Sequence, residues 1–408
     1  MRRRDFLRSV TALSGLAFVR VGSQAWAAQN PNGAPQRLVV VLLRGAIDGL
    51  NVVIPYTEKP YYTMRPTIAV PPPGRENGAL DLDRQFALHP QLAPLMPMWK
   101  ERSLAFVHAC GSPAETRSHF EGQANIESGT PGVKVTSDGW LNRTLSALPG
   151  PHGTTEAVNF GPTMPLILRG AVSVASLPSA GGGDGKVAAP PLIHAGFDTI
   201  YSGTDSLSTA YREGQSAHLR LMSDLEQDMS EAAAGAPSPV GFARDAARFC
   251  QLVRKDPTVQ VGFFALSGWD THVREGSIQG ALPYHLRQLA QGFAEFRSGL
   301  GESGYANTVI LVVSEFGRTA RENGNAGTDH GHGNAMWVMG GPVRGGRVYG
   351  QWPTLAEEHL YQGRDLAVTT DFRTVVASVL TGHMKLSAAA VSRVFPNATA
   401  STLRILNA

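Results

Sequence analysis

Short apolar runs separated by polar loops dominate the chain and predict buried strands. Most of these runs are rich in Val, Leu, Ile or Phe and end at a Gly, a Ser or a charged residue, as is typical of strands covered on both faces. The predicted strands are residues 37–43, 104–107, 172–177, 259–266, 308–313 and 335–339.

Longer stretches with apolar residues at helical spacing lie between these runs. The predicted helices are residues 92–100, 137–148, 206–233, 242–255, 283–300 and 369–380. Residues 235–239, rich in Gly and Pro, resemble a hinge, so residues 206–239 form a candidate helical insertion. Strands that alternate with helices predict the α/β class with a mostly parallel central sheet.

Carboxylates and imidazoles gather in the loops that follow several predicted strands. The carboxyl ends of parallel strands meet at one edge of a sheet, where open α/β sheets bind their ligands. These side chains are the ligand types of Zn²⁺ or Mn²⁺, whereas Ca²⁺ favours fewer imidazoles. The candidate metal ligands are Asp48, Asp270, His272, Glu315, Asp329, His330 and His332.

Each motif also has a plainer explanation. Asp48 alone fits an Asx turn or a helix cap, and the His-Gly-His loop fits an exposed turn. Gly331 and Gly333 would let the backbone bend closely around a ligand. Because similar clusters recur in several loops, we predict a site for one or two divalent ions. Such ions clamp an anionic group and activate a hydroxyl or water.

The turn after the 104–107 strand carries hydroxyl groups at a predicted helix start. Thr116 or Ser118 is a candidate nucleophile there, because the helix dipole favours an anion. Ser118 with Glu121 also fits a capping box, and the two roles are not exclusive. Arg117 is a candidate oxyanion-binding group or a surface residue, and His119 is either a ligand or a packed polar residue.

Residues 1–28 read as a leader rather than as part of the fold. Residues 3–7 (RRDFL) form a twin-arginine signal, and residues 25–27 (AWA) form a small-x-small cleavage site. The apolar run between them is too short and too interrupted for a membrane span. We expect the Tat machinery to export the folded protein, with a mature chain from near Ala28 in the periplasm or outside the cell. An uncut anchor is the alternative.

The charge balance excludes one class of function. The chain has 36 Lys and Arg, 33 Asp and Glu and a formal charge of +3. Residues 1–27 hold five arginines and one aspartate, which leaves 31 basic and 32 acidic residues, a net charge of −1. No basic surplus marks a nucleic-acid surface. The two cysteines, Cys110 and Cys250, allow one disulfide or two buried thiols.

Five segments of the chain form a distinctive joint pattern: RLVVVLLRGAIDGLNVVIPY from residue 37, HACGSPAETRSHFEGQ from 108, SGWDTH from 267, SEFGRTARENGNAGTDHGHGNAMWVMGG from 314, and DLAVTTDFRTVV from 365. Together they resemble a Tat-exported bacterial family catalogued as a domain of unknown function and grouped with the alkaline phosphatase and sulfatase superfamily. The resemblance runs over nearly the whole mature chain. It implies one alkaline phosphatase-like domain over residues 29–408, built as a three-layer α/β/α sandwich.

The resemblance also suggests roles for the candidate residues. Asp48 matches the superfamily's early Asp, and Asp270 with His272 resembles its middle pair, at a narrower spacing. Glu315 stands where an Asp-His pair is expected, which removes one imidazole. His330 or His332 would supply the last ligand, and Thr116 or Ser118 the nucleophile. The chain has no Cys-x-Pro-x-Arg motif, which argues against a formylglycine sulfatase.

These observations predict a metal-dependent hydrolase of phosphate or sulfate esters. Its substrate would be an anionic small molecule or polymer, and the attacking group either a hydroxyl or a water activated by the metal. Arg44, Arg117 and Arg318 are candidates to neutralise the substrate oxyanion. Two alternatives stand beside it. The first is a non-catalytic exported binding or assembly protein with a reduced or structural metal site, and the second is a protein that binds no metal.

Overall fold

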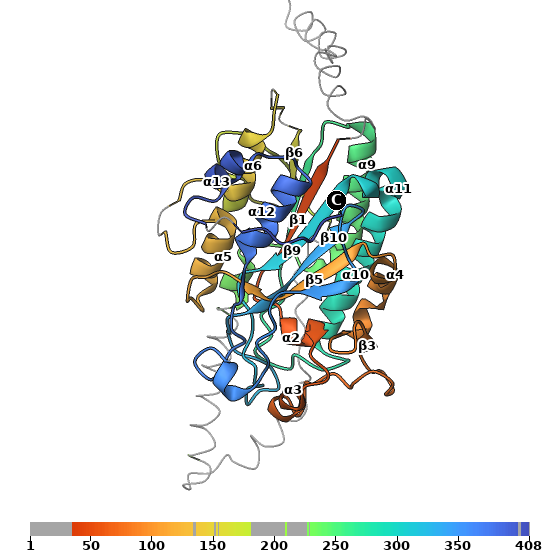
Figure 1. Cartoon of the computed structure of the whole chain (residues 1–408), viewed down its shortest axis with the longest axis vertical. Coiled ribbons are helices and arrows are strands. Elements are labelled where there is room, and N and C mark those ends of the chain that lie inside the picture. Colours follow the sequence, from red (N-terminus) through yellow and green to blue (C-terminus); the bar gives the residue numbers. More distant parts are fainter. Residues whose placement is uncertain are drawn as a thin grey trace, which may run out of the picture. The chain divides into compact units, whose positions relative to one another are not determined.

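One mixed sheet forms the middle of the molecule (Figure 1). The computed structural model describes residues 35–398, except 134–135, 151, 154, 181–208, 210–226 and 228, and residues 401–407. Within this part, nine strands have the order β11-β5-β10-β9-β1-β8-β6-β7, with β12 paired to β5. The strands are β1 Arg37–Leu43, β5 Leu104–Gly111, β6 Ala157–Phe160, β7 Ala175–Leu177, β8 Val261–Leu266, β9 Thr308–Ser314, β10 Asn334–Gly340, β11 Arg347–Tyr349 and β12 Thr370–Asp371.

The strands run mostly parallel, as predicted. Parallel pairs join β1 to β8 and β9, β6 to β7 and β8, and β5 to β11 and β12. Only β10 departs from this pattern among the described pairs of this sheet, because it runs antiparallel to both β9 and β5. The first strand of the sequence, β1, therefore lies in the interior of the sheet between two strands from the second half of the chain.

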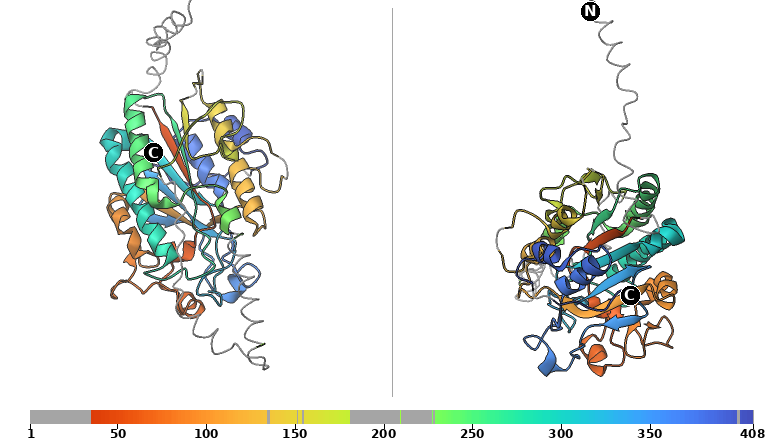
Figure 2. Two further views of the ribbon diagram at one scale, coloured as in Figure 1. Left: turned by 180° about the vertical axis from the view of Figure 1, so that it is seen from behind. Right: turned by 45° about the horizontal axis from the view of Figure 1, so that its top comes forward.

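Helices cover both faces of the sheet and complete the predicted α/β/α sandwich (Figures 1 and 2). One face is covered by α5 His119–Ser128, α6 Trp140–Ala147, α12 Phe372–Gly382 and α13 Ala388–Val394. The other face is covered by η1 Pro90–Leu95, α4 Met96–Lys100, α9 Phe242–Lys255 and α10 Ala281–Gly299. The fold is thus an α/β fold with two cores, one on each side of the sheet.

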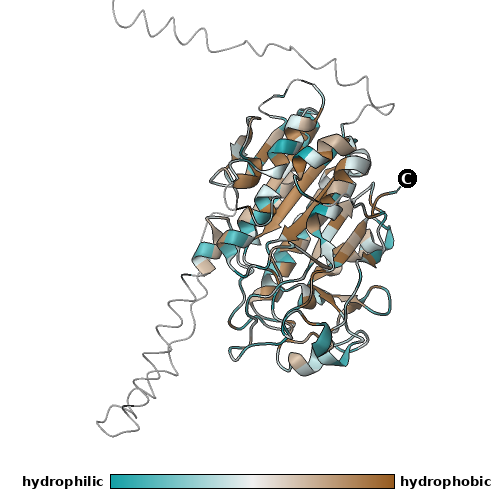
Figure 3. Cartoon of the chain, turned by 60° about the vertical axis from the view of Figure 1, so that its left-hand side comes forward, coloured by the Kyte–Doolittle hydropathy of each residue, from teal (hydrophilic) through white to brown (hydrophobic). Residues whose placement is uncertain are grey.

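The side-chain alternation of β1 shows why its sequence is apolar throughout. Leu38, Val40 and Leu42 pack into one core, whereas Val39, Val41 and Leu43 pack into the other. Successive strand residues point to opposite faces, so a strand covered on both sides has no position for an exposed polar residue. Figure 3 shows the consequence, with hydrophobic strands enclosed by helices of mixed polarity.

Some elements differ from the predicted ones. Residues 52–80 lie outside every predicted helix and strand, but they contain α3 Lys59–Met64 and β2 Val53–Ile54. A small second sheet has the order β2, β4 Ala87–Leu88, β3 Leu80–Asp81. The predicted helix 92–100 is divided into η1 and α4. Pro94 and Pro97 explain the division, because proline cannot donate the backbone hydrogen bond that a continuous helix needs.

Two predictions fall largely outside the described residues: the leader at 1–28 and most of the candidate insertion at 206–239. Among the residues that are described, no helix combines the length and the hydrophobicity that crossing a membrane requires. Cys110 in β5 and Cys250 in α9 are buried free thiols in the two different cores, so they do not form a disulfide with each other.

Candidate metal centre

Three loops and one helix start converge at the carboxyl edge of the sheet. The loops follow β1, β8 and β9, which are parallel neighbours, so their carboxyl ends lie side by side. The fourth segment is the start of α5, where the Ser118 hydroxyl accepts a hydrogen bond from the Glu121 backbone N–H at 3.5 Å. This cap sets the first turn of α5 so that His119, which is buried, faces the loop after β9.

Three imidazoles meet at one point, each through its Nε2 atom. The Nε2 atom of His330 lies 2.9 Å from that of His119 and 2.9 Å from that of His272. Asp270 Oδ1 lies 3.6, 3.1 and 3.4 Å from the Nε2 atoms of His119, His272 and His330. We call these four residues the candidate metal centre.

The opposite ring nitrogen of each histidine is held by an acceptor. His119 Nδ1 lies 2.8 Å from Glu315 Oε1, His272 Nδ1 lies 3.2 Å from Asp329 Oδ1, and His330 Nδ1 lies 2.8 Å from the Arg117 carbonyl oxygen. Carboxylates and carbonyls only accept, so in each neutral ring the proton resides on Nδ1. The three Nε2 atoms then face one another and Asp270 Oδ1, an arrangement that suits a divalent cation.

The pKa values of the imidazoles follow from burial and from the neighbouring carboxylates. Burial alone lowers the pKa of a histidine, but hydrogen bonds to Asp270 and Glu315 raise the pKa of His119 to about 9. Asp270 and Asp329 likewise raise the pKa of His272 against the effect of burial, whereas burial lowers that of His330. The carboxylates thus favour positive charge at the cluster.

Asp270 is the carboxylate of the cluster. Burial alone would raise its pKa, but hydrogen bonds from the three histidines and the charge of Arg318 hold the pKa well below its usual range. Arg318 forms an ion pair with Oδ1, whereas the buried Oδ2 has no hydrogen-bond partner among the described residues. An orphaned carboxylate oxygen beside three imidazole lone pairs fits a metal ligand.

The donor set suits a borderline divalent ion. The ligand atoms of His119, Asp270 and His330 all lie within 4.8 Å of one another. Tetrahedral zinc with bonds of about 2.0–2.1 Å separates its ligands by roughly 3.3 Å, and the separations given above, 2.9–3.6 Å, bracket that value. Imidazole and carboxylate ligands are compatible with Zn²⁺ or Mn²⁺.

Asp48 lies outside this cluster. Its carboxylate caps α2 Gly49–Val52 by accepting a hydrogen bond from the Leu50 N–H, and it forms an ion pair with the fully buried Arg65. Arg65 is also fixed by the carbonyl oxygens of Thr319 and Ala320, at 2.8 Å each. A buried guanidinium already neutralises Asp48, so this carboxylate is not brought together with the imidazoles as the sequence suggested.

Glu315 and Asp329 contact the Nδ1 atoms of His119 and His272, on the side of each ring opposite to the Nε2 atoms. Glu315 Oε1 also accepts hydrogen bonds from the Gly45 N–H at 2.7 Å and from Gln123 Nε2 at 3.1 Å, which fixes its position. His332 is likewise not part of the cluster, because its ring stacks on Tyr361 with 4.6 Å between ring centroids.

The candidate oxyanion-binding arginines have different surroundings. Arg318 is fully buried, and besides Asp270 it donates to the carbonyl oxygens of Ala46 after β1, Trp269 after β8 and Thr328. It therefore ties the loops together. Arg44 is paired with Glu127, whereas Arg117 is partly exposed and held by Asp365 at 2.5 Å.

His119 is the residue whose role the sequence left open. Its signal was an imidazole at a predicted helix start, which the sequence left as either a ligand or a packed polar residue. The second hydroxyl candidate in this turn, Thr116, donates from Oγ1 to Glu121 Oε2 at 2.8 Å. The structure thus assigns local hydrogen bonds to both hydroxyl candidates and turns the neighbouring imidazole toward the cluster.

The fold and site define an α/β protein with a candidate metal centre at the carboxyl edge of its sheet. The chain belongs to the family described as Protein of unknown function (DUF1501), whose sequence model matches residues 35–395. No curated protein sequence matches the chain.

Several solved structures are similar to the chain at low identity. One is a protein of the alkaline phosphatase superfamily from Vibrio parahaemolyticus, which is 12% identical in sequence and gives a TM-score of 0.39. The match covers 78% of this chain and 63% of that chain. Another is the lipoteichoic acid synthase LtaP from Listeria monocytogenes, with 8% identity, coverages of 93% and 78%, and a TM-score of 0.40. A third is a 2-O GAG sulfatase, with 10% identity, coverages of 76% and 65%, and a TM-score of 0.34. The chain thus spans less than two thirds of the first and third of these proteins. Likenesses at this level carry no information about activity.

Proposed function

We propose that the protein is an exported, metal-dependent hydrolase of phosphate or sulfate esters. The observation that carries the proposal is the convergence of three imidazole Nε2 atoms beside Asp270, with every Nδ1 atom held by an acceptor. A divalent ion bound there would supply a Lewis acid for an ester oxygen. Since Arg65 already neutralises Asp48, the residues favour one ion, zinc or manganese.

The chain's own residues position the ligands and receive the substrate. Glu315, Asp329 and the Arg117 carbonyl orient the three rings. The Arg117 side chain is 31% exposed, whereas that of Arg318 is fully buried, so Arg117 is the better placed of the two to contact an anionic substrate. An anionic ester, as a small molecule or as part of a polymer, is the substrate class that this arrangement favours.

The attacking group is tested by removing the two hydroxyls of the α5 turn. Ser118 is exposed at the start of α5, and Thr116 lies two residues before it. If either hydroxyl is the nucleophile, its replacement by alanine should lower kcat by at least a hundredfold without loss of bound metal. Turnover that survives in both Ser118→Ala and Thr116→Ala would exclude covalent catalysis by these residues and leave water as the attacking group.

Elemental analysis of the purified mature protein tests the metal centre. We expect about one zinc or manganese ion per chain, retained in His332→Ala and lost in His330→Ala. The two variants are matched, because both remove an imidazole from the same loop but only His330 lies in the candidate metal centre. Metal in the wild type should be followed by a screen of phosphate and sulfate esters. A wild-type chain that stays free of metal after reloading contradicts the proposal.

A second candidate function is an exported binding or assembly protein with a structural ion. It is favoured by the observation that both hydroxyl candidates are engaged in local hydrogen bonds at the start of α5. Against it, Arg318 and Arg65 already tie the loops together through carbonyl oxygens. Tight metal retention without turnover of any ester would support this second candidate.

Export through the Tat machinery is part of the proposal and rests on the leader sequence. The pair Arg3 and Arg4 should be essential, because that machinery recognises a twin arginine. We expect the wild-type chain in the periplasmic fraction or the medium, and Arg3→Lys/Arg4→Lys in the cytoplasmic fraction at full length. Equal distribution of the two chains would contradict Tat export.

A further inference from the structure

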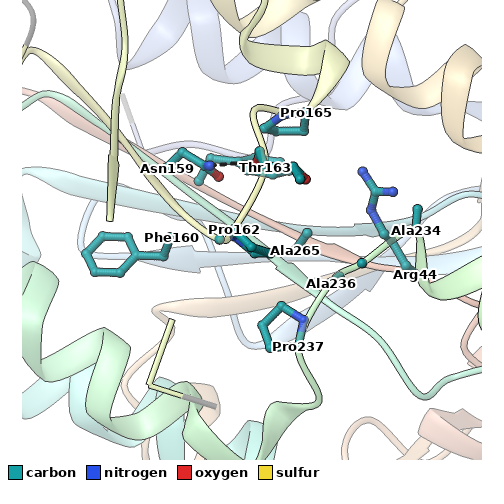
Figure 4. Close-up of a pocket in the computed structure, with 13 residues that line it drawn as sticks. Arg44, Asn159, Phe160, Pro162, Thr163, Pro165, Ala234, Ala236, Pro237 and Ala265 are labelled. Atoms are coloured by element: carbon teal, nitrogen blue, oxygen red, sulfur yellow. Dashed lines mark hydrogen bonds between the residues drawn. The ribbon is translucent and has the colours of Figure 1, made fainter. Parts of the chain in front are cut away.

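A pocket separate from the candidate metal centre opens at the carboxyl ends of β1, β6 and β8 (Figure 4). It encloses about 260 Å³, including space open to solvent. Arg44 stands on one side, and Asn159 and Thr163 lie on the other, with Pro165, Ala236 and Pro237 among the remaining lining residues. Of the described residues that line the pocket, Arg44 alone carries a charge.

The Nε donor of Arg44 is not used by any residue that the structure describes. Its Nη1 atom donates to Gln123 Oε1 at 2.8 Å, and its Nη2 atom donates to Glu127 Oε1 at 2.6 Å. Its Nε atom is buried and has no hydrogen-bond partner among the described residues, although the residue as a whole is only 7% exposed. A buried N–H without an acceptor is costly, so a ligand that brings an acceptor oxygen is favoured here.

The Asn159 amide on the opposite wall offers an acceptor. Asn159 Nδ2 donates to the Thr163 carbonyl oxygen at 3.0 Å and to Ser176 Oγ at 3.1 Å. Because the carbonyl oxygen can only accept, these bonds fix the orientation of the amide and leave Oδ1 as the remaining polar atom of Asn159. A fitting ligand therefore combines an anionic oxygen for Arg44 with an O–H for Asn159.

We propose that this pocket is a second ligand site that binds inorganic phosphate in its hydrogenphosphate form, independently of the candidate metal centre. Hydrogenphosphate carries both an anionic oxygen and an O–H, whereas sulfate at neutral pH has no O–H. The pocket lining includes none of the four residues of the candidate metal centre. The proposal therefore holds or fails apart from the ester hydrolase activity.

Calorimetric titration of the purified mature protein with phosphate, and separately with sulfate, tests the site. We expect one phosphate per chain in the wild type and in His330→Ala, with sulfate bound at least tenfold more weakly. Arg44→Lys keeps a positive charge beside Glu127 but lacks the Nε donor, so it should bind phosphate at least tenfold more weakly. Arg297→Lys is the control, because Arg297 lies outside the pocket lining and over the ring of Tyr305, which does not line the pocket either.

A second variant covers the case in which Arg44→Lys does not fold. Ala236→Leu adds volume to the pocket wall without removing a charge or a hydrogen bond, and it should also abolish phosphate binding. The proposal is overturned if the wild type binds no phosphate, if sulfate binds as tightly, or if Arg44→Lys and Ala236→Leu bind normally. Loss of the phosphate site in His330→Ala would also overturn it, because the anion would then belong to the metal centre.

Discussion

Each imidazole of the candidate metal centre is fixed from behind by an acceptor on its Nδ1 atom. The acceptors differ in exposure, since Glu315 is fully buried whereas the Asp329 side chain is 52% exposed. Glu315 is also held by the Gly45 N–H and by Gln123, so its position is the more strongly determined. An acceptor of this kind fixes the ring tautomer and increases the basicity of the Nε2 lone pair.

Removal of these acceptors should therefore weaken metal binding. We expect Glu315→Gln and Asp329→Asn to lower the affinity for zinc by about 10–100-fold, with the larger loss in Glu315→Gln. Competition with a chromogenic chelator measures the affinity. Glu302→Gln is the control, because the Glu302 side chain is 87% exposed and pairs with Arg297 on the surface. Unchanged affinity in both test variants would show that the imidazoles do not bind the ion as described.

The candidate centre was only partly predictable from individual residues. Three of its residues follow strands in the sequence: Asp270, His272 and His330. Parallel pairing of those strands brings their carboxyl ends to one edge of the sheet, and this can be predicted from the sequence. The separate environment of Asp48 was not predictable, because Arg65 lies 17 positions further on in a segment without a strong pattern. The role of Glu315 likewise depends on His119, 196 positions earlier in the chain.

At the scale of elements, the loop between β9 and β10 presents His330 through close backbone contacts. Gly317 donates its N–H to the His332 carbonyl oxygen at 2.9 Å, and Gly331 donates to the Gly317 carbonyl oxygen at 2.8 Å. A Cβ atom on Gly331 would overlap the Arg318 carbonyl group. The sequence predicted a glycine-dependent bend at position 331. The structure explains it, because the loop folds back on itself there and leaves no room for a side chain.

Gly331→Ala should displace His330 and destabilise the fold by about 1–3 kcal/mol, because backbone atoms cannot move aside as a flexible side chain can. Chemical denaturation and metal content measure the two effects. Gly324→Ala in the same loop is a matched control, because a Cβ there meets no atom within 4 Å. Wild-type stability and metal content in Gly331→Ala would contradict the assigned loop geometry.

The length and burial of each strand determine whether its sequence pattern predicts it. Strands covered on both faces, such as β1 and β9, are continuous apolar runs and were found with bounds close to those observed. The strand β6 was missed, because it has four residues with Asn159 among them. The strands β2 and β3 were not predicted either, because a strand of two residues is too short to show an alternating pattern of apolar and polar residues.

At the scale of the whole molecule, three histidines outside the centre are buried as neutral groups. Burial lowers the pKa of His89, His108 and His383 to about 4. Each accordingly bonds a carbonyl oxygen, and His108 Nε2, for example, lies 2.7 Å from that of Val53. An unfolded chain titrates its histidines near pH 6.5, so it binds more protons than the folded chain between about pH 4 and 6.5.

The contribution of these three histidines to stability should therefore be full above about pH 6.5 and should decline as the pH falls toward 4. We expect each of them to cost about 1 kcal/mol in the free energy of unfolding by about pH 5.5. Urea denaturation between pH 5 and 8 measures the stability, and His383→Gln, which keeps a donor for the Arg37 carbonyl oxygen, should lose about 1 kcal/mol less than the wild type between pH 6.5 and 5.5. The same pH dependence in His383→Gln and in the wild type would contradict neutral burial.

The position of β1 in the sheet has a consequence for biosynthesis. Both partners of this strand, β8 and β9, begin only at Val261 and Thr308, so the growing chain carries RLVVVLL for most of its translation without the strands that will cover it. An exposed apolar strand is prone to aggregate, and nascent chains that delay their pairing depend on chaperones. His330 lies later still, so the candidate metal centre is complete only after most of the protein has left the ribosome.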